Sequence, residues 1–181
     1  REAYERVNRL LGSETASAAV KPELRISMAW LQARLSFDTG DLERTLSLVD
    51  RLVVAVAVNV AKQPLFTSEE RVALIRRAVD DEPRVQVESF QGLLVDFARR
   101  MNVRMIIRGL RAVSDFEYEY QMALMNRHLA SEMETVFMIP SLDTTHVSSS
   151  MVREIARFGG DVSSLVHPAV VDALRARFAK G

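Results

Sequence analysis

The spacing of hydrophobic positions changes near residue 50 of this chain. From residue 52 onward, short apolar runs alternate with longer amphipathic ones, and residues 52–58 are apolar at every position, as in a parallel strand buried on both faces. Strand and helix alternate four times, which predicts an α/β fold with a doubly wound parallel sheet. We expect strands at 52–58, 85–90, 103–107 and 135–139, and helices at 68–81, 93–101, 115–130, 148–158 and 168–179.

Residues 1–50 follow a helical spacing instead. Apolar positions recur at helical intervals in residues 4–11, 26–37 and 42–52. Residues 29–42 loosely resemble half of a tetratricopeptide repeat, although a single such unit cannot bury its apolar face alone. An amphipathic helical hairpin packed on the main domain is an equally good interpretation. We therefore predict a helical hairpin appendage over 1–50 and an α/β domain over 51–181.

Composition and charge narrow the class of protein. The 181 residues include 24 acidic and 24 basic side chains and no cysteine. Zero net charge does not favour a nucleic-acid partner, and no apolar run reaches the roughly 18 residues of a membrane span. The absence of cysteine excludes disulfides and fits a cytoplasmic protein. The chain does not begin with Met, so we expect a fragment or a processed product.

Candidate chemistry lies where the predicted strands end, because open α/β sheets bind ligands outside the carboxyl ends of their strands. Lys62 follows the first predicted strand and can meet a phosphate, or it is a solvated loop lysine. Arg108 and Arg111 flank Gly109 after the third; they suit phosphate oxygens, or they pair with the nearby acids Asp115, Glu117 and Glu119.

Three serines, Ser148, Ser149 and Ser150, begin the helix after the fourth strand, where free backbone N–H groups form an anion site or the serines merely cap the helix. Together these elements predict a polyanionic ligand, namely a nucleoside triphosphate with a phosphorylated acceptor. The three histidines lack metal-ligand spacing, so no protein metal site is predicted. We expect His128 on a helix surface and His167 in a structural role, whereas His146 is a ligand contact or a solvated loop residue. Met122 and Met125 are expected in the core or at a subunit interface.

Several motifs resemble bacterial phosphopantetheine adenylyltransferase in order and spacing. They are Asn-Val-Ala-Lys-Gln-Pro-Leu-Phe at 59–66, Gly-Leu-Leu-Val-Asp-Phe-Ala at 92–98, Arg-Gly-Leu-Arg-Ala-Val-Ser-Asp-Phe-Glu-Tyr-Glu at 108–119, and Ser-Ser-Ser at 148–150. The resemblance covers about residues 43–181. It implies transfer of AMP from ATP to 4′-phosphopantetheine, which gives dephospho-coenzyme A and pyrophosphate in coenzyme A biosynthesis. It also implies Mg²⁺ with ATP, coenzyme A as a product-like inhibitor, and a homo-oligomer, a hexamer in the family.

The resemblance also assigns roles to residues. It implies catalytic roles for Lys62 and Arg111. It places Lys62, Leu94 and Arg108 at the acceptor. The implied ATP contacts are Gly109, Arg111, Glu119, Thr144, Thr145, His146, Val147, Ser148, Ser149 and Ser150.

One family motif departs from the pattern. The family opens with a strand that ends in Gly-Thr/Ser-Phe-Asp-Pro, and a catalytic histidine follows it. Here Ser36-Phe37-Asp38-Thr39-Gly40-Asp41 is only similar, and no histidine precedes His128. We therefore expect a Rossmann-like sheet that lacks the usual first strand. The alternative to an enzyme is a non-catalytic nucleotide- or coenzyme A-binding remnant or chimera.

Overall fold

Among the residues that the structure describes, five parallel strands form a central sheet. The computed structural model describes residues 26–29, 46, 49–58, 64–80, 82–110, 113–138 and 147–179. The strand order is β3-β2-β1-β4-β5, and every neighbouring pair is parallel. The strands are β1 (Ile26–Ala29), β2 (Arg51–Ala57), β3 (Val85–Phe90), β4 (Met105–Gly109) and β5 (Glu134–Met138).

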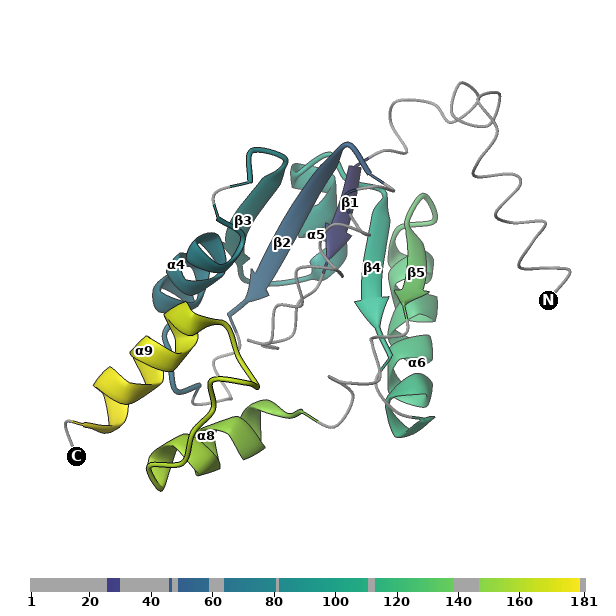
Figure 1. Ribbon diagram of the computed structural model, residues 1–181. Helices are drawn as coiled ribbons and strands as arrows, with labels where there is room; N and C mark the ends of the chain where they lie inside the picture. Colours follow the sequence, from purple (N-terminus) through teal and green to yellow (C-terminus); the bar gives the residue numbers. More distant parts are fainter. Residues whose placement is uncertain are drawn as a thin grey trace, which may run out of the picture.

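Helices cover both faces of this sheet (Figure 1). The described helices are α4 (Ser68–Ala78), α5 (Leu94–Arg100), α6 (Val113–Leu129), α8 (Ser149–Arg157) and α9 (Pro168–Phe178). Side chains alternate between the faces of β2: Val53 and Ala55 pack in a core with α5, whereas Val54 and Val56 pack in a second core with α4. The predicted doubly wound α/β sheet is confirmed, and so is each predicted strand and helix after residue 50, with no boundary shifted by more than three residues.

The expectation that the first strand is missing is wrong. Residues 26–29 form β1, which pairs with β2 through Ile26–Ala29 and with β4 through Ser27–Ala29. The prediction of a helix over residues 26–37 is therefore wrong for residues 26–29, which form a strand. Two parallel neighbours supply ladder hydrogen bonds on both edges of β1, and this non-local pairing outweighs a local helical spacing. The remaining helices predicted before residue 45 lie outside the described residues, and the division at residue 50 stays a prediction.

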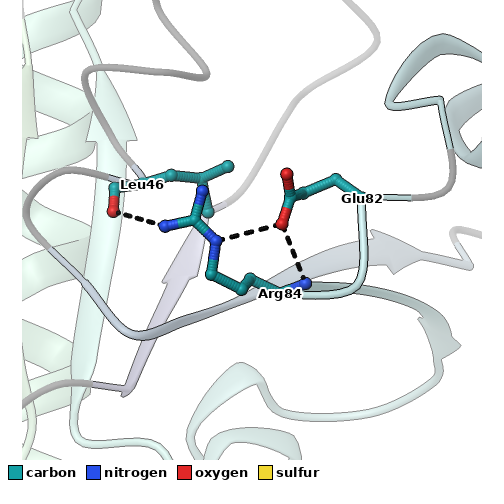
Figure 2. Close-up of polar contacts among 3 residues, drawn as sticks. All are labelled: Leu46, Glu82 and Arg84. Atoms are coloured by element: carbon teal, nitrogen blue, oxygen red, sulfur yellow. Dashed lines mark hydrogen bonds and ion pairs between the residues drawn. The ribbon is translucent and has the colours of Figure 1, made fainter.

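The segment that leads into β2 is held at the amino edge of the sheet. Figure 2 shows Arg84, which precedes β3, donating from Nη1 to the carbonyl oxygen of Leu46 at 3.2 Å. Its Nε also donates to Glu82 Oε1 at 3.0 Å, and this hydrogen bond is the main cause that lowers the pKa of Glu82. The side chains of Leu46 and Val49 are buried with β2 in the core under α4. Residues 46 and 49 are thus part of the α/β core.

Candidate active site at the carboxyl edge of the sheet

The strand order reverses beside β1. The chain runs outward from β1 to β2 and β3, and then returns to place β4 on the other side of β1. Such a switch point leaves a crevice at the carboxyl ends of the two diverging strands, where open α/β sheets bind their ligands. The last pair between β1 and β4 joins Ala29 and Ile107, so Arg108 and Gly109 extend one and two residues further toward that edge.

A bidentate ion pair between Arg108 and Glu119, called the fork below, lies at this position. Arg108 Nε donates to Glu119 Oε2 at 2.7 Å, and Nη2 donates to Oε1 at 2.5 Å. The two side chains are only 11% and 9% exposed, so the pair is nearly enclosed. Glu119 comes from α6, the helix that follows β4, and lies nearly two turns from its start. Among the three acids that the sequence offered, the structure thus shows Glu119 as a partner of Arg108.

The pairing has two consequences for ligand binding. The fork fixes the plane of the guanidinium, which is the preorganisation that phosphate recognition needs. The pair is also close to neutral, so other cations must supply most of the attraction for a polyanion. A Cβ added at Gly109 would meet no atom within 4 Å, so the space beside this backbone is open to an approaching group.

The start of α8 is the second element of the site. In Figure 1, α8 lies on the side of the sheet to which the strand arrows point. Ser148 caps the helix, since its Oγ accepts from the N–H of Met151 at 3.2 Å. Ser149 and Ser150 are exposed in the first turn, which contains no acidic residue. The positive end of the helix dipole is therefore uncompensated within the helix, as in anion sites at helix starts.

Two further residues that were predicted for the site lie at the edges of these elements. Val147 is buried, and its side chain joins the core between α8 and α9. Leu94 is the first residue of α5 and packs, half-buried, against the core that contains Phe90 and Phe97. Both are apolar residues that support the carboxyl edge of the sheet.

Some predicted residues lie outside the described part of the chain. These are Lys62, Arg111, Thr144, Thr145 and His146, and also the motif at 36–41. Their roles stay predictions. His128 is exposed on α6, as predicted. His167 has the structural role predicted for it, since its Nδ1 accepts from the N–H of Ala169 and caps α9. Met122 and Met125 are exposed in this chain and do not join its core.

Arg71 belongs to the same edge and was missed from the sequence. It extends from α4 and donates from Nη1 to the carbonyl oxygen of Ala57, the last residue of β2, at 3.3 Å. Burial lowers the pKa of its guanidinium. Its position in the first turn of a helix that begins at this edge is the signal that could have revealed it.

Neither a metal cage nor a membrane span was found among the described residues. They contain no group of three or more histidine, cysteine or acidic side chains placed to hold a metal ion. No helix in the same part of the chain is long and apolar enough to cross a membrane.

Comparison with known proteins agrees with this fold. Residues 41–155 match the cytidylyltransferase-like family model, so the chain has the fold of a nucleotidyltransferase. Phosphopantetheine adenylyltransferase of Anaeromyxobacter dehalogenans strain 2CP-C is 53% identical over 139 residues, which are 77% of this chain and 85% of that protein. The enzyme of the same name from Heliobacterium modesticaldum is 53% identical over 137 residues, 76% of this chain and 82% of its own length. The phosphopantetheine adenylyltransferase of Thioalkalivibrio sulfidiphilus is 54% identical over 139 residues, which are 77% of this chain and 87% of that protein.

These similarities confirm the resemblance seen in the sequence motifs. The chain belongs to the phosphopantetheine adenylyltransferase family, a group of nucleotidyltransferase enzymes.

Proposed function

We propose that this chain transfers the adenylyl group of ATP to 4′-phosphopantetheine, forming dephospho-coenzyme A and pyrophosphate. The observation that carries the proposal is the enclosed Arg108–Glu119 fork at the switch point of the sheet, in a chain of this family. The start of α8 supports it, because exposed serines and free N–H groups suit a triphosphate. A remnant without activity was the alternative, because the first-strand motif with the catalytic histidine is absent from the sequence; the strand itself is present as β1.

The proposed step is an in-line displacement at the α-phosphorus of ATP. A phosphate oxygen of 4′-phosphopantetheine attacks, a P–O bond forms to the acceptor, and the P–O bond to pyrophosphate breaks, so pyrophosphate leaves with the electron pair. Such reactions depend mainly on positioning and on stabilising charge at the transferred group. Lys62 and Arg111 are the proposed catalytic cations.

Binding roles follow from position at the edge of the sheet. Arg108 at the end of β4 and Leu94 at the start of α5 are proposed to contact the acceptor together with Lys62. Gly109 and Glu119 are proposed to contact the nucleotide, and a carboxylate in a fork retains acceptor sites for hydroxyl donors. Residues 144–150 are proposed to hold the adenine and the phosphates, with Ser148–Ser150 supplying the helix start.

Mg²⁺ is proposed to enter with ATP. Mg²⁺ is often held largely by substrate phosphates and water, with few protein carboxylates, and it would neutralise charge on the triphosphate. The enclosed fork and the acid-free start of α8 fit a metal that the nucleotide carries.

A cytoplasmic homo-oligomer, a hexamer, is proposed as the working assembly, with coenzyme A as a product-like inhibitor. Helix α6 and the edge strand β5 expose large apolar side chains that a partner subunit would cover. They are Tyr118, Leu124, Met125 and Val136, which are 63%, 50%, 53% and 41% exposed. Sedimentation velocity of the wild-type chain and of Met125→Asp tests this, and only the wild type is expected to sediment as a hexamer.

The function is tested by incubating the chain with ATP, 4′-phosphopantetheine and Mg²⁺. Pyrophosphate release is followed by a coupled assay, and dephospho-coenzyme A is identified by mass spectrometry. Calorimetric titration with each substrate runs in parallel. Product formation with binding of both substrates supports the proposal. Binding without turnover indicates a remnant, and the absence of binding refutes the proposed site as well.

A further inference from the structure

Helix α8 ends in a turn that contains two glycines, Gly159 and Gly160, before the chain continues to α9 (Figure 1). The N–H of Gly160 donates to the carbonyl oxygen of Ile155 at 2.9 Å, and the N–H of Gly159 donates to that of Ala156 at 3.1 Å. Gly159 has a left-handed backbone, with a φ of 76°. Together these features form a Schellman motif, which satisfies carbonyl groups that a helix end leaves free. The turn therefore ends α8 in one defined geometry.

The two glycines have different surroundings. A Cβ added at Gly160 would lie 2.6 Å from Ile155 Cγ2 and 3.1 Å from the Ile155 carbonyl oxygen. A Cβ added at Gly159 would meet no atom within 4 Å. Among the described glycines, the left-handed backbone is found at Gly92 and Gly159 and not at Gly160. Gly159 thus permits the backbone of the turn, whereas Gly160 permits a close approach to Ile155.

Ile155 has little freedom to move away from a larger residue at position 160. Its Cγ2 is attached directly to Cβ, and isoleucine in a helix keeps one strongly preferred χ1 rotamer. The side chain also packs, half-buried, against the core that contains Val147 and Val152. A displacement of the Ile155 methyl group therefore requires a displacement of the α8 backbone.

The chain after the turn is held in place as well. Val162 and Val166 are buried in the core between α8 and α9. Asp161 Oδ1 accepts from the N–H of Ser163 at 3.0 Å, and Asp161 Oδ2 accepts from the hydroxyl of the same residue at 2.9 Å. An overlap between position 160 and Ile155 is therefore expected to move α8, because the connection to α9 is fixed on its other side.

The opposite end of α8 carries the exposed serines Ser149 and Ser150. The helix has nine residues. Its ends are therefore roughly 13 Å apart. Carbon atoms in ordinary contact are about 3.5 Å apart, so a Cβ at position 160 requires a shift of about 1 Å. A short hydrogen-bonded helix moves as one body, and the shift reaches both serines. A misplacement of about 1 Å can reduce a rate about 10²-fold.

We propose that Gly160 is a positioning residue for ATP, because its contact with Ile155 fixes where α8 presents Ser149 and Ser150. The proposal rests on the proposed function, in which this helix start meets the triphosphate. Gly160→Ala is expected to raise the Kd of Mg²⁺-ATP about 5- to 30-fold and to lower kcat/KM for ATP by up to about 10²-fold.

The acceptor should be affected much less by the same variant. Leu94, which is proposed to contact the acceptor, packs in a different core from α8. The Kd of 4′-phosphopantetheine should therefore stay within about 2-fold of the wild-type value. A loss of stability alone would not separate the two substrates in this way.

Gly159→Ala is the matched control in the same turn. It imposes a left-handed backbone on a residue with a Cβ, so Tm is expected to fall. It places no atom against Ile155, and ATP affinity should match the wild type.

A second change tests whether Gly160 acts through Ile155. Ile155→Ala removes Cγ2 and is expected to lower Tm, because it shortens a side chain that packs on the core. In the double variant Ile155→Ala/Gly160→Ala the overlap with Cγ2 is gone. Its ATP affinity should therefore return to that of Ile155→Ala alone, so that the two changes are non-additive.

The experiment measures the Kd of Mg²⁺-ATP and of 4′-phosphopantetheine by calorimetry, with kcat, both KM values and the Tm of each variant. A selective loss of ATP affinity in Gly160→Ala supports the proposal if Ile155→Ala restores it and Gly159→Ala binds ATP normally. Wild-type ATP affinity in Gly160→Ala, equal losses in the two glycine variants, or no recovery in the double variant overturns the proposal.

Two further outcomes also decide the positioning role. If Gly160→Ala does not fold, the double variant is compared with Ile155→Ala: equal ATP affinity supports the proposal, and weaker binding by the double variant overturns it. If the wild type binds ATP without turnover, the proposed function fails and the Kd values still decide the role of Gly160. A wild type that does not bind ATP overturns both.

Discussion

Helices α4 and α8 begin at the same edge of the sheet. They differ in the side chains that cap the free backbone N–H groups of their first turns. The start of α4 is closed by its own side chains, with the Thr67–Glu70 capping box and two acids, Glu69 and Glu70, in the first turn. The start of α8 has a serine cap and no acid. A helix start that already carries carboxylates repels a polyanion, whereas one with only hydroxyls attracts it. The comparison divides this edge into a helix start with a structural role and a helix start that we propose binds the triphosphate.

The largest expected effect comes from the fork beside these helices. Arg108→Ala leaves the carboxylate of Glu119 enclosed without this partner, which destabilises a protein by about 3–5 kcal/mol when the pair is fully buried. We expect Tm to fall and kcat/KM to fall by about 10²–10³. Glu117→Ala, an exposed acid on the same helix, is the control and should match the wild type.

The double variant Arg108→Ala/Glu119→Gln separates structure from chemistry. Removing the unpaired charge should restore much of the Tm, while kcat/KM stays low. Recovery of both would mean that the fork has only a structural role.

The second prediction concerns an acidic residue introduced into the first turn of α8, which would then resemble the start of α4. Ser149→Asp places an acid in the first turn of α8, which should stabilise the helix by about 0.3–1 kcal/mol while it repels the triphosphate. We expect Kd for ATP to rise about 10- to 100-fold with an unchanged or higher Tm. Ser68→Asp makes the matched change on α4, where ATP affinity should stay the same. Calorimetry and thermal unfolding check both, and equal losses of ATP affinity would contradict the comparison.

The third prediction concerns the cap of α4. Thr67→Ala removes the oxygen that accepts from the N–H of Glu70, and loss of such a cap costs about 1 kcal/mol of stability. Urea unfolding should show a lower midpoint with an unchanged m value, and Kd for ATP should match the wild type. A marked loss of ATP affinity would show that the start of α4 also serves the nucleotide.

The smallest expected effect is a change in the pKa of Glu69, which lies at the start of α4. The pKa of Glu69 is lowered first by a backbone N–H and then by the hydroxyls of Thr67 and Ser68. A lowered folded-state pKa stabilises the fold above the unfolded value of about 4.3, and this contribution is lost as pH falls through the folded value. NMR titration should give a pKa nearer the ordinary value in Ser68→Ala than in the wild type. If Glu69 has the same pKa in the wild type and in Ser68→Ala, the Ser68 hydroxyl does not contribute to the lowered pKa.

Local signals in the sequence predicted much of this edge. The capping box at Thr67 and Glu70 is recognisable because its partners are three residues apart. Ser148 was predicted at the start of a helix because a run of three serines precedes a helical segment. The sequence also placed Arg108 at the end of a strand, since a short apolar run precedes it.

Features that depend on distant parts of the chain were harder to predict. Strand β1 was missed because Ile26–Ala29 has only four residues and becomes a strand through its pairing with β2 and β4. The sequence did not show which of three acids pairs with Arg108, because the pairing depends on how α6 packs after the turn. Arg71 was missed because only the packing of α4 shows that it reaches Ala57.

The most direct test of the account compares the two helix starts in one experiment. Backbone amide shifts of Ser149 and Ser150 on α8, and of Ser68 and Glu69 on α4, are followed by NMR during titration with Mg²⁺-ATP. We predict large, saturable shifts on α8 that give the same Kd as calorimetry, and small shifts on α4. Saturable shifts on α4 with an unchanged α8 would contradict it.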